Sequence, residues 1–204
     1  MRTIVVCHPT PKDIKKIFSL NDDDYIIAVD QAVIDLYKQR IKIDLAVGDF
    51  DSLKNHGVLT NLNVIKLKPE KDVTDTYQAL LEAKKMDSSE LVLIGGVGGD
   101  RIEHFMVHLM HFDAFPDLRI IDDHSEIFML TKGVHPISFD GYVSVFAYPD
   151  AVVTLDGFKY PLKAYKLTAF DPLGISNEII DDKASINVLE GRVIVVLSVK
   201  DRTY

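Results

Sequence analysis

The fold of this protein is decided by residues 91–101, which read LVLIGGVGGDR. The apolar run Leu91–Ile94 is short and uncharged, which is typical of a strand buried on both faces of a sheet. Glycines then interrupt the run, and a helical pattern follows them over residues 104–114. Because a buried strand, a turn and a helix form half of a βαβ unit, the stretch indicates a parallel α/β sheet.

The same alternation extends outward from this stretch. Five further apolar runs are interpreted as buried strands, at residues 4–7, 25–29, 45–47, 64–67 and 118–121. Helical patterns lie at residues 13–20, 31–39 and 74–86, in addition to the one at 104–114. We therefore expect an α/β fold with a mostly parallel sheet flanked by helices, in which ligands bind beyond the carboxyl ends of the strands.

The pattern changes after about residue 125. Eight short runs there are rich in β-branched or aromatic residues: 127–130, 134–139, 142–147, 152–155, 158–162, 165–168, 184–189 and 193–199. Turn pairs such as Asp140-Gly141 and Glu190-Gly191 separate them. This spacing predicts an antiparallel β-sandwich or barrel, of which we expect the sandwich. The predicted domains are an α/β domain over residues 1–125 and a smaller all-β sandwich domain over residues 126–204.

Composition excludes several classes of function. The chain has 204 residues and a net charge of −8, so we expect no nucleic acid as a partner. No apolar run reaches the roughly 18 residues that span a bilayer, and the N-terminus lacks the features of a signal peptide. We therefore expect a cytoplasmic protein without membrane attachment. With Cys7 as the single cysteine, an intramolecular disulfide and CxxC zinc motifs are excluded.

Two pairs of aspartates follow strands of the predicted sheet. Asp49 and Asp51 come after one buried strand, where residues i and i+2 of an extended chain point to the same side. Neighbouring carboxylates repel each other, and a hard cation such as Mg²⁺ removes the repulsion. Asp72 and Asp75 follow the next strand. Both pairs also have a structural interpretation, an acidic turn for the first and a helix-capping box for the second, and the pattern leaves the choice open.

The glycine run is a candidate phosphate site. Glycine amides approach phosphate closely, the N-terminus of the following helix favours anions, and Arg101 can donate two hydrogen bonds to a phosphate. The run is not a Walker A motif, and Arg101 stands where a GxGxxG fingerprint needs its third glycine. A tight strand-to-helix turn is the alternative. His104, His108 and His111 share the following helix, but a metal site there is disfavoured because further His or Cys ligands are not evident.

Taken together and in this order, these motifs resemble those of bacterial thiamine pyrophosphokinases. The stretches that carry the resemblance are AVDQA at 28–32, DLAVGDFDS at 44–52, KDVTD at 71–75, the glycine loop up to His104, GFKYPL at 157–162 and GISNE at 174–178. The resemblance implies transfer of a pyrophosphoryl group from ATP to the hydroxyl of thiamine, which gives thiamine diphosphate and AMP, with Mg²⁺ as cofactor. It also implies a homodimer whose active site lies near the subunit interface.

The resemblance assigns individual residues as well. The implied catalytic and metal-binding residues are Asp49, Asp51, Asp72 and Asp75. The implied ATP-binding residues are Asp30, Gln31, Ser52, Lys71, Gly98, Arg101 and His104, and the implied thiamine-binding residues are Ser176 and Asn177. The chain departs from the family at Asp100, where a glycine is usual, and at Glu103, where an aspartate is usual. It also has no Trp to stack on the thiamine ring.

Two other functions use the same residues. A metal-dependent phosphohydrolase would keep the aspartates but release phosphate from a nucleotide without any need for thiamine. A non-catalytic binding module for nucleotide or thiamine would bind without turnover, and Asp100 and Glu103 would then mark lost activity. The glycine loop and the second domain argue against the hydrolase.

Overall fold

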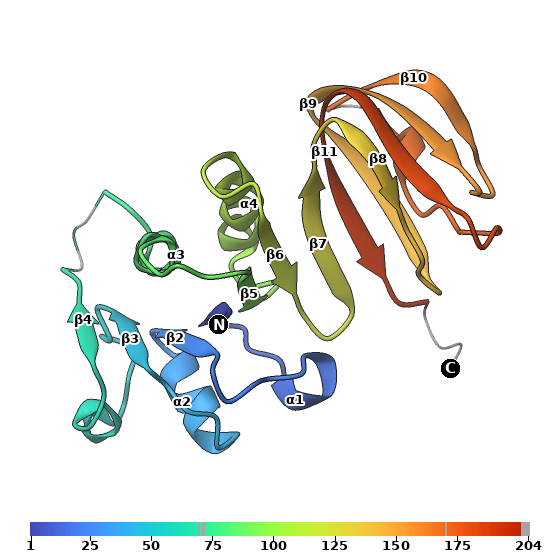
Figure 1. Cartoon of the computed structure of the whole chain (residues 1–204). Helices are drawn as coiled ribbons and strands as arrows, with labels where there is room; N and C mark the ends of the chain where they lie inside the picture. The colour runs from blue at the N-terminus through green and yellow to red at the C-terminus, as the bar shows by residue number, and fades with distance from the viewer. Residues whose placement is uncertain (69, 71, 170, 201–204) are drawn as a thin grey trace. The chain divides into compact units, whose positions relative to one another are not determined.

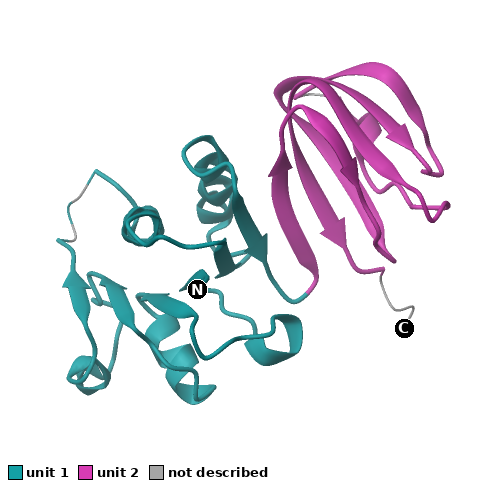
Figure 2. Cartoon of the chain, in the orientation of Figure 1, with its two compact units in different colours: residues 1–123 teal, residues 124–204 magenta. Residues whose placement is uncertain are grey.

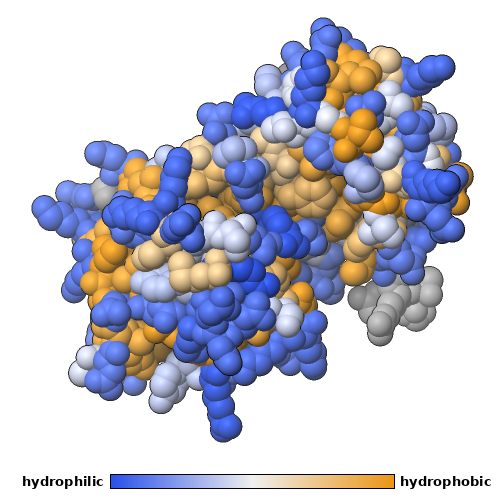
Figure 3. All heavy atoms as spheres, viewed as in Figure 1, coloured by the Kyte–Doolittle hydropathy of each residue, from blue (hydrophilic) through white to orange (hydrophobic). Residues whose placement is uncertain are grey.

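The computed structural model describes residues 1–68, 70, 72–169 and 171–200. The chain divides into two compact units, residues 1–123 and residues 124–204 (Figure 2). Unit 1 alternates strands with helices, and unit 2 is built of antiparallel strands. On the face of the molecule drawn in Figure 3, hydrophilic side chains are spread over both units, with apolar residues between them. In the described ranges, no helix combines the length and the apolar character that crossing a membrane requires.

Unit 1 contains the predicted parallel sheet (Figure 1). Its strands are β1 (Thr3–Cys7), β2 (Tyr25–Val29), β3 (Leu45–Gly48), β4 (Val64–Lys66), β5 (Leu91–Gly95) and β6 (Leu118–Ile121). Its helices are α1 (Ile14–Ile17), α2 (Ala32–Lys38), α3 (Asp75–Lys84) and α4 (Ile102–Met110), with short 3-10 turns η1 (His56–Leu59) and η2 (His111–Asp113). All pairs within the unit are parallel, in the order β6-β5-β1-β2-β3-β4. The expected α/β sheet is confirmed.

Helices cover this sheet on both faces. One face, which includes Ile4 and Ile26, packs in a single apolar cluster with Val33 and Leu36 of α2. Helix α3 contacts β1, β2 and β3 from the other side and buries Leu80 (Figure 1). Because apolar side chains are removed from water on both faces, the central strands need no polar side. That explains why continuous apolar runs were sufficient to locate them.

The strand order reverses at β1. From β1 the chain proceeds through β2, β3 and β4 on one side, and then returns to place β5 and β6 on the other side. In sheets of this kind, ligands bind in the crevice at the carboxyl ends of the strands, next to such a reversal. The loops after β1, β2, β3 and β5 are therefore the places to look for a site.

Unit 2 has fewer and longer strands than the sequence predicts. They are β7 (Ser125–Leu130), β8 (Gly133–Pro136), β9 (Tyr142–Asp156), β10 (Leu162–Thr168) and β11 (Ser185–Ser198), with a 3-10 turn η3 (Pro172–Gly174). The runs at 142–147 and 152–155 join into β9, and those at 184–189 and 193–199 join into β11. The predicted strand at 158–162 is wrong, since Phe158 forms an isolated bridge with Ile179 and only Leu162 belongs to a strand, as the first residue of β10.

The two long strands nevertheless form the expected sandwich, because both are bent. In one layer, the last part of β11 pairs with β7 on one side and with the first part of β9 on the other. In the other layer, the first part of β11 pairs with β8 and with the second part of β9, which also pairs with β10. Irregularities in the pairing of β9 with β11 fall near Gly191, whose φ of 77° is the left-handed conformation that glycine tolerates. Val145 and Val188, from the two halves, belong to one buried apolar cluster. Strands that bend from one layer into the other are a known way to build such a core.

Candidate functional site

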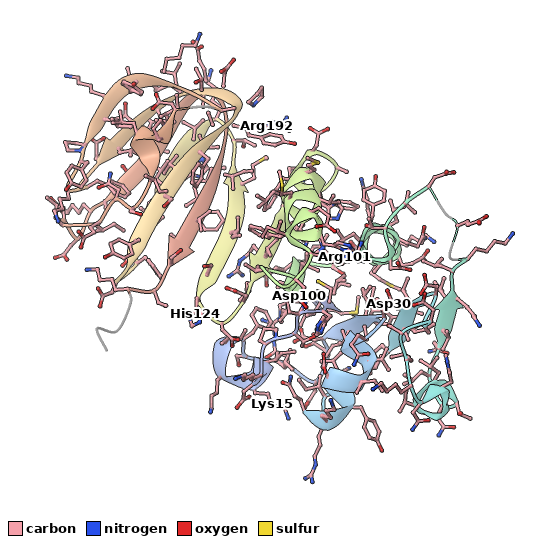
Figure 4. The ribbon with its side chains drawn as sticks, turned by 180° about the vertical axis from the view of Figure 1, so that it is seen from behind. Lys15, Asp30, Asp100, Arg101, His124 and Arg192 are labelled. Atoms are coloured by element: carbon pink, nitrogen blue, oxygen red, sulfur yellow. The ribbon has the colours of Figure 1, made fainter. Side chains whose placement is uncertain are left out.

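A pocket of about 570 Å³ opens at the carboxyl ends of the strands of unit 1. Its lining consists of Cys7, His8, Pro9, Val29, Asp30, Gln31, Asp49, Ser52, Thr74, Asp75, Thr76, Gly98, Gly99, Asp100, Arg101 and His104. Figure 4 labels Asp30, Asp100 and Arg101, which follow β2 and β5. The volume lies within the range of about 300–1,000 Å³ that is usual for small-molecule sites.

Asp30 is fixed at the junction of β2 and α2. Its φ of 45° is left-handed, which is uncommon for a residue other than glycine and is often found at functional sites. Its carboxylate accepts a hydrogen bond from the backbone amide of Phe50 at 3.3 Å. A Cβ on Gly48 would overlap that carboxylate, so the end of β3 accepts the Asp30 side chain only because residue 48 is a glycine. The ends of β2 and β3 are thus tied together by one side chain.

The turn after β3 separates the first pair of aspartates. Phe50, between them, has a φ of 59° and buries its side chain, with 1% exposed. The chain is therefore not extended at this point, so the argument that an extended chain places Asp49 and Asp51 on one side does not apply. Asp49 lines the pocket and its carboxylate accepts a hydrogen bond from the Asp51 amide at 3.3 Å, as in the acidic-turn interpretation. Asp51 is exposed and is not among the lining residues.

The second pair is also divided between pocket and solvent. Helix α3 begins at Asp75, and Thr74 caps it by accepting a hydrogen bond from the Tyr77 amide at 3.1 Å. The capping-box interpretation, which would make Asp72 the N-cap, is therefore wrong. Asp75 lines the pocket, whereas Asp72 is exposed and is not among the lining residues. Lys71, the predicted ATP-binding residue next to them, lies outside the described residues.

The glycine loop after β5 has a packed side and an open side. Gly95, Gly96, Gly98 and Gly99 have φ values between 69° and 84°, a left-handed series that only glycine adopts at low cost. A Cβ on Gly96 would collide with buried side chains, whereas a Cβ on Gly98 would meet nothing within 4 Å. Gly98 and Gly99 line the pocket. The open side of the loop thus gives the backbone close access to whatever occupies the pocket.

Arg101 and His104, at the start of α4, also line the pocket. The Arg101 Nε donates to the carboxylate of Glu103 at 3.1 Å, and both side chains are exposed. A hydrogen bond from its own backbone amide, followed by the one from Arg101, holds the pKa of Glu103 below its usual value. Glu103 is not among the lining residues, so in this structure it contacts Arg101 and does not face the pocket.

The charges of the described lining residues are mostly negative. The lining residues include four aspartates, Asp30, Asp49, Asp75 and Asp100, and one arginine, Arg101. The described residues contain no group of three or more His, Cys, Asp or Glu side chains placed to hold a metal ion. Mg²⁺ is commonly bound by one or two carboxylates together with the phosphates of a substrate and water. The lining therefore fits a hard cation that arrives with a phosphate ligand.

Some lining residues were not predicted. Cys7 ends β1 and is followed by His8 and Pro9, and Thr74 and Thr76 flank Asp75 at the start of α3. Cys7 pairs in register with Gly95 of β5, which brings the end of β1 next to the glycine loop. This pairing joins residues far apart in the chain, so the sequence held no local signal for the first group. The apolar run at 4–7 predicted the strand but not its neighbour.

The two predicted thiamine-binding residues in unit 2 have different environments. Ser176 is exposed, has a φ of 52°, and donates its backbone amide to the Ser144 hydroxyl at 2.9 Å. Asn177 is 3% exposed. Its amide donates to the Tyr160 carbonyl at 2.8 Å and accepts from the amides of Tyr160 at 3.0 Å and Glu178 at 2.9 Å. The Asn177 side chain thus holds the backbone at Tyr160, and Ser176 is the one that reaches the surface.

Unit 1 is an α/β unit with an acid-rich pocket at its strand ends, and it is followed by a β-sandwich. Comparison with known proteins identifies the family to which this pair of units belongs. The model for the catalytic domain of thiamin pyrophosphokinase matches residues 18–121, and the model for the vitamin B1 binding domain of thiamin pyrophosphokinase matches residues 130–193. The chain belongs to the thiamin pyrophosphokinase family and is an enzyme that makes thiamine diphosphate.

Individual relatives resemble the chain over almost its whole length. A protein of Bacillus subtilis (strain 168) named thiamine pyrophosphokinase is 29% identical, over 97% of this chain and 99% of that one. The crystal structure of thiamine pyrophosphokinase from Bacillus subtilis has a TM-score of 0.86 and 26% identity, and covers 98% of this chain and 100% of that one. The crystal structure of thiamin pyrophosphokinase from Geobacillus thermodenitrificans has the same TM-score and identity, with 100% of each chain covered.

Proposed function

We propose that this enzyme transfers a pyrophosphoryl group from ATP to the hydroxyl of thiamine, giving thiamine diphosphate and AMP, and that the reaction requires Mg²⁺. The α/β domain, residues 1–125, binds the nucleotide, and the β-sandwich domain, residues 126–204, binds thiamine. The observation that carries the proposal is the pocket itself, in which carboxylates from the ends of β2, β3 and α3 meet a glycine loop and an arginine. Membership of the family supports it.

The proposed metal ligands are Asp49, Asp51, Asp72 and Asp75, of which Asp49 and Asp75 line the pocket. Bound Mg²⁺ supplies neutralisation of the triphosphate charge. Without it, the lining carboxylates would repel the triphosphate, because both carry negative charge. The lining carboxylates therefore disfavour binding of a free nucleotide and favour binding of a nucleotide that is complexed with a cation.

The remaining lining residues position the nucleotide. The Arg101 guanidinium and the backbone amides of the glycine loop, including that of Gly98, donate hydrogen bonds to phosphate oxygens. The other residues that we propose to contact the nucleotide are Asp30, Gln31, Ser52, Lys71 and His104. A phosphoryl-type transition state is loose, so positioning and charge neutralisation supply most of the catalysis and a covalent nucleophile is not needed.

Thiamine is proposed to meet unit 2 at Ser176. The exposed hydroxyl of Ser176 is available for a hydrogen bond with the substrate, while Asn177 supports the same loop from inside. We therefore propose different roles for these two neighbouring residues. Ser176 contacts substrate, and Asn177 maintains the loop that presents it.

We also propose that the protein is a cytoplasmic homodimer with the active site near the subunit interface. Helix α4 exposes Ile102, Met106 and Met110, which are 56%, 55% and 59% accessible. Residues four apart lie on the same side of a helix, so these three form an apolar stripe that supports association. Sedimentation velocity on the purified protein tests this proposal, and a single species at monomer mass over the working concentrations would contradict it.

Product analysis tests the proposed reaction. When ATP, Mg²⁺ and thiamine are mixed with the enzyme, we expect AMP and thiamine diphosphate in equal amounts. ADP as the only nucleotide product would exclude pyrophosphoryl transfer. Phosphate release that does not need thiamine would favour the phosphohydrolase, and calorimetric binding of ATP or thiamine without turnover would favour the binding module.

A further inference from the structure

We propose that His108 is a positioning residue that holds the glycine loop from inside the protein and thereby sets its affinity for the nucleotide. The inference rests on the proposed function, because it takes the glycine loop to bind the phosphates of ATP. His108 lies on α4, is 3% exposed, and does not line the pocket. It acts through the backbone of the loop and not by touching the substrate.

A hydrogen bond connects His108 to the loop. The Nδ1 atom of His108 lies 3.1 Å from the carbonyl oxygen of Gly96. A carbonyl oxygen can only accept, so Nδ1 must carry the proton and donate it. The bond ties the loop to the last turn of α4. Gly96 is also held to the segment that follows β1, because its amide donates to the Pro9 carbonyl at 2.9 Å. The loop is therefore held from two elements on its packed side.

Packing around Gly96 explains why this contact is tight. A Cβ on Gly96 would lie 2.6 Å from the Cys7 Sγ and 2.7 Å from the His108 Nδ1, distances that real Cβ atoms do not show. The imidazole and the thiol thus occupy the space that a larger residue would need. At Gly98, by contrast, a Cβ would meet nothing within 4 Å, and this residue lines the pocket. A loop that is supported on one face and open on the other is preorganised to offer its amides to a phosphate.

The surroundings keep the imidazole in the form that this role needs. Burial lowers the pKa of His108 to about 4, so the ring is neutral at physiological pH. Its neighbour His111, whose ring centre lies 5.7 Å away, has a pKa lowered to about 4 for the same reason. Two neutral rings do not repel each other. With Nδ1 protonated and the ring uncharged, one tautomer is selected by the carbonyl of Gly96.

Loss of this hydrogen bond should weaken nucleotide binding selectively. A loop that is not held must be ordered when the nucleotide binds, and that cost reduces affinity. A net hydrogen bond is worth about a fivefold to tenfold change in an equilibrium constant. We therefore expect the KM for ATP to rise by about that factor, while the KM for thiamine stays within about twofold, since thiamine is placed on unit 2.

Two substitutions separate the hydrogen bond from the volume of the side chain. His108→Leu keeps an apolar side chain of related size but removes the donor, and should show the fivefold to tenfold rise in the KM for ATP. His108→Asn places an amide donor near the position of Nδ1, and should restore the KM for ATP to within about twofold of the unmodified enzyme. Equal rises for ATP and thiamine in the Leu variant would overturn the inference, and so would an unchanged KM for ATP.

A measurement on the unmodified enzyme keeps the test independent of whether the Leu variant folds. Nitrogen-15 NMR of the histidine rings distinguishes the two neutral tautomers, and we expect His108 to be protonated at Nδ1. Protonation at Nε2 would overturn the hydrogen bond and the inference with it. If the unmodified enzyme neither binds nor consumes ATP, the proposed function fails instead, and the tautomer still reports on the contact with Gly96.

Discussion

Replacement of Asn177 by Ala should destabilise the protein even when no substrate is present. The Asn177 amide makes three hydrogen bonds to backbone groups of residues 160 and 178, at 2.8, 3.0 and 2.9 Å, and the residue is 3% exposed. Alanine leaves all three backbone groups without this partner. At about 1 kcal/mol for each bond, the loss is about 3 kcal/mol in the free energy of unfolding of unit 2. For a unit of this size, that corresponds to a fall in Tm of about 10–20 °C.

The assay is thermal unfolding of the substrate-free protein, followed by circular dichroism, with urea unfolding to give the free energy directly. Ser176→Ala is the matched control. Its side chain is exposed, and the backbone amide that bonds Ser144 remains in the variant, so its stability should change by less than about 0.5 kcal/mol. The control should instead raise the KM for thiamine more than the KM for ATP.

Either of two results would refute this reasoning. If Asn177→Ala melted at the same temperature as the unmodified protein while thiamine binding was lost, the amide would serve the substrate and not the backbone at Tyr160. If both substitutions lowered Tm equally, the difference between a buried and an exposed residue would not matter in this loop. Either outcome would require a different account of the motif at 174–178.

Three further predictions concern unit 1. Asp24→Asn should lower the free energy of unfolding by about 1–3 kcal/mol, because the Asp24 carboxylate accepts bonds from the partly exposed Arg2 at 2.6 and 2.9 Å and asparagine keeps only one acceptor oxygen. The hydrogen bond from Arg2 lowers the pKa of Asp24 in the folded state, so its stabilisation is present above the unfolded pKa of about 3.9 and is lost as the pH falls through the folded value. Urea unfolding as a function of pH should therefore show a smaller loss of stability on acidification in the variant than in the unmodified protein. Asp49→Asn should lower kcat by about 100-fold and weaken the dependence on Mg²⁺ while Tm is retained, and near-normal turnover would contradict the proposed metal role. Asp100→Gly removes one of the four lining carboxylates, so the KM for ATP should fall by about twofold to fivefold, and a rise would mean that Asp100 assists binding.

Unit 1 could be predicted well because its signals are local. The run at 25–29 became β2 with the same bounds, and the runs at 91–94 and 118–121 became β5 and β6 within one residue. Strands buried on both faces need continuous apolar runs, and polar residues or glycines end them. The run length and its boundaries therefore both appear in the sequence itself.

Unit 2 was predicted less accurately because two different structures share one local signal. Glu190-Gly191 was interpreted as a turn between two strands, but the pair lies within β11, at an irregularity in its pairing with β9. A glycine with a left-handed φ serves either a chain reversal or a bulge. Which of them forms depends on whether a partner strand continues alongside, and that partner is distant in the sequence.

The candidate site shows the same division. The sequence by itself determined that carboxylates follow two strands and that a glycine loop precedes a helix, since these features need only the order of neighbouring residues. Only the tertiary structure decided that Asp49 and Asp75 line the pocket while Asp51 and Asp72 do not, because the buried Phe50 turns the chain and Thr74 takes the cap of α3. Strand order likewise decided that the end of β1 lies next to the glycine loop. Short-range steric preferences and periodicity depend on residues that are close in the sequence. Contacts between distant residues depend on how the helices and strands pack.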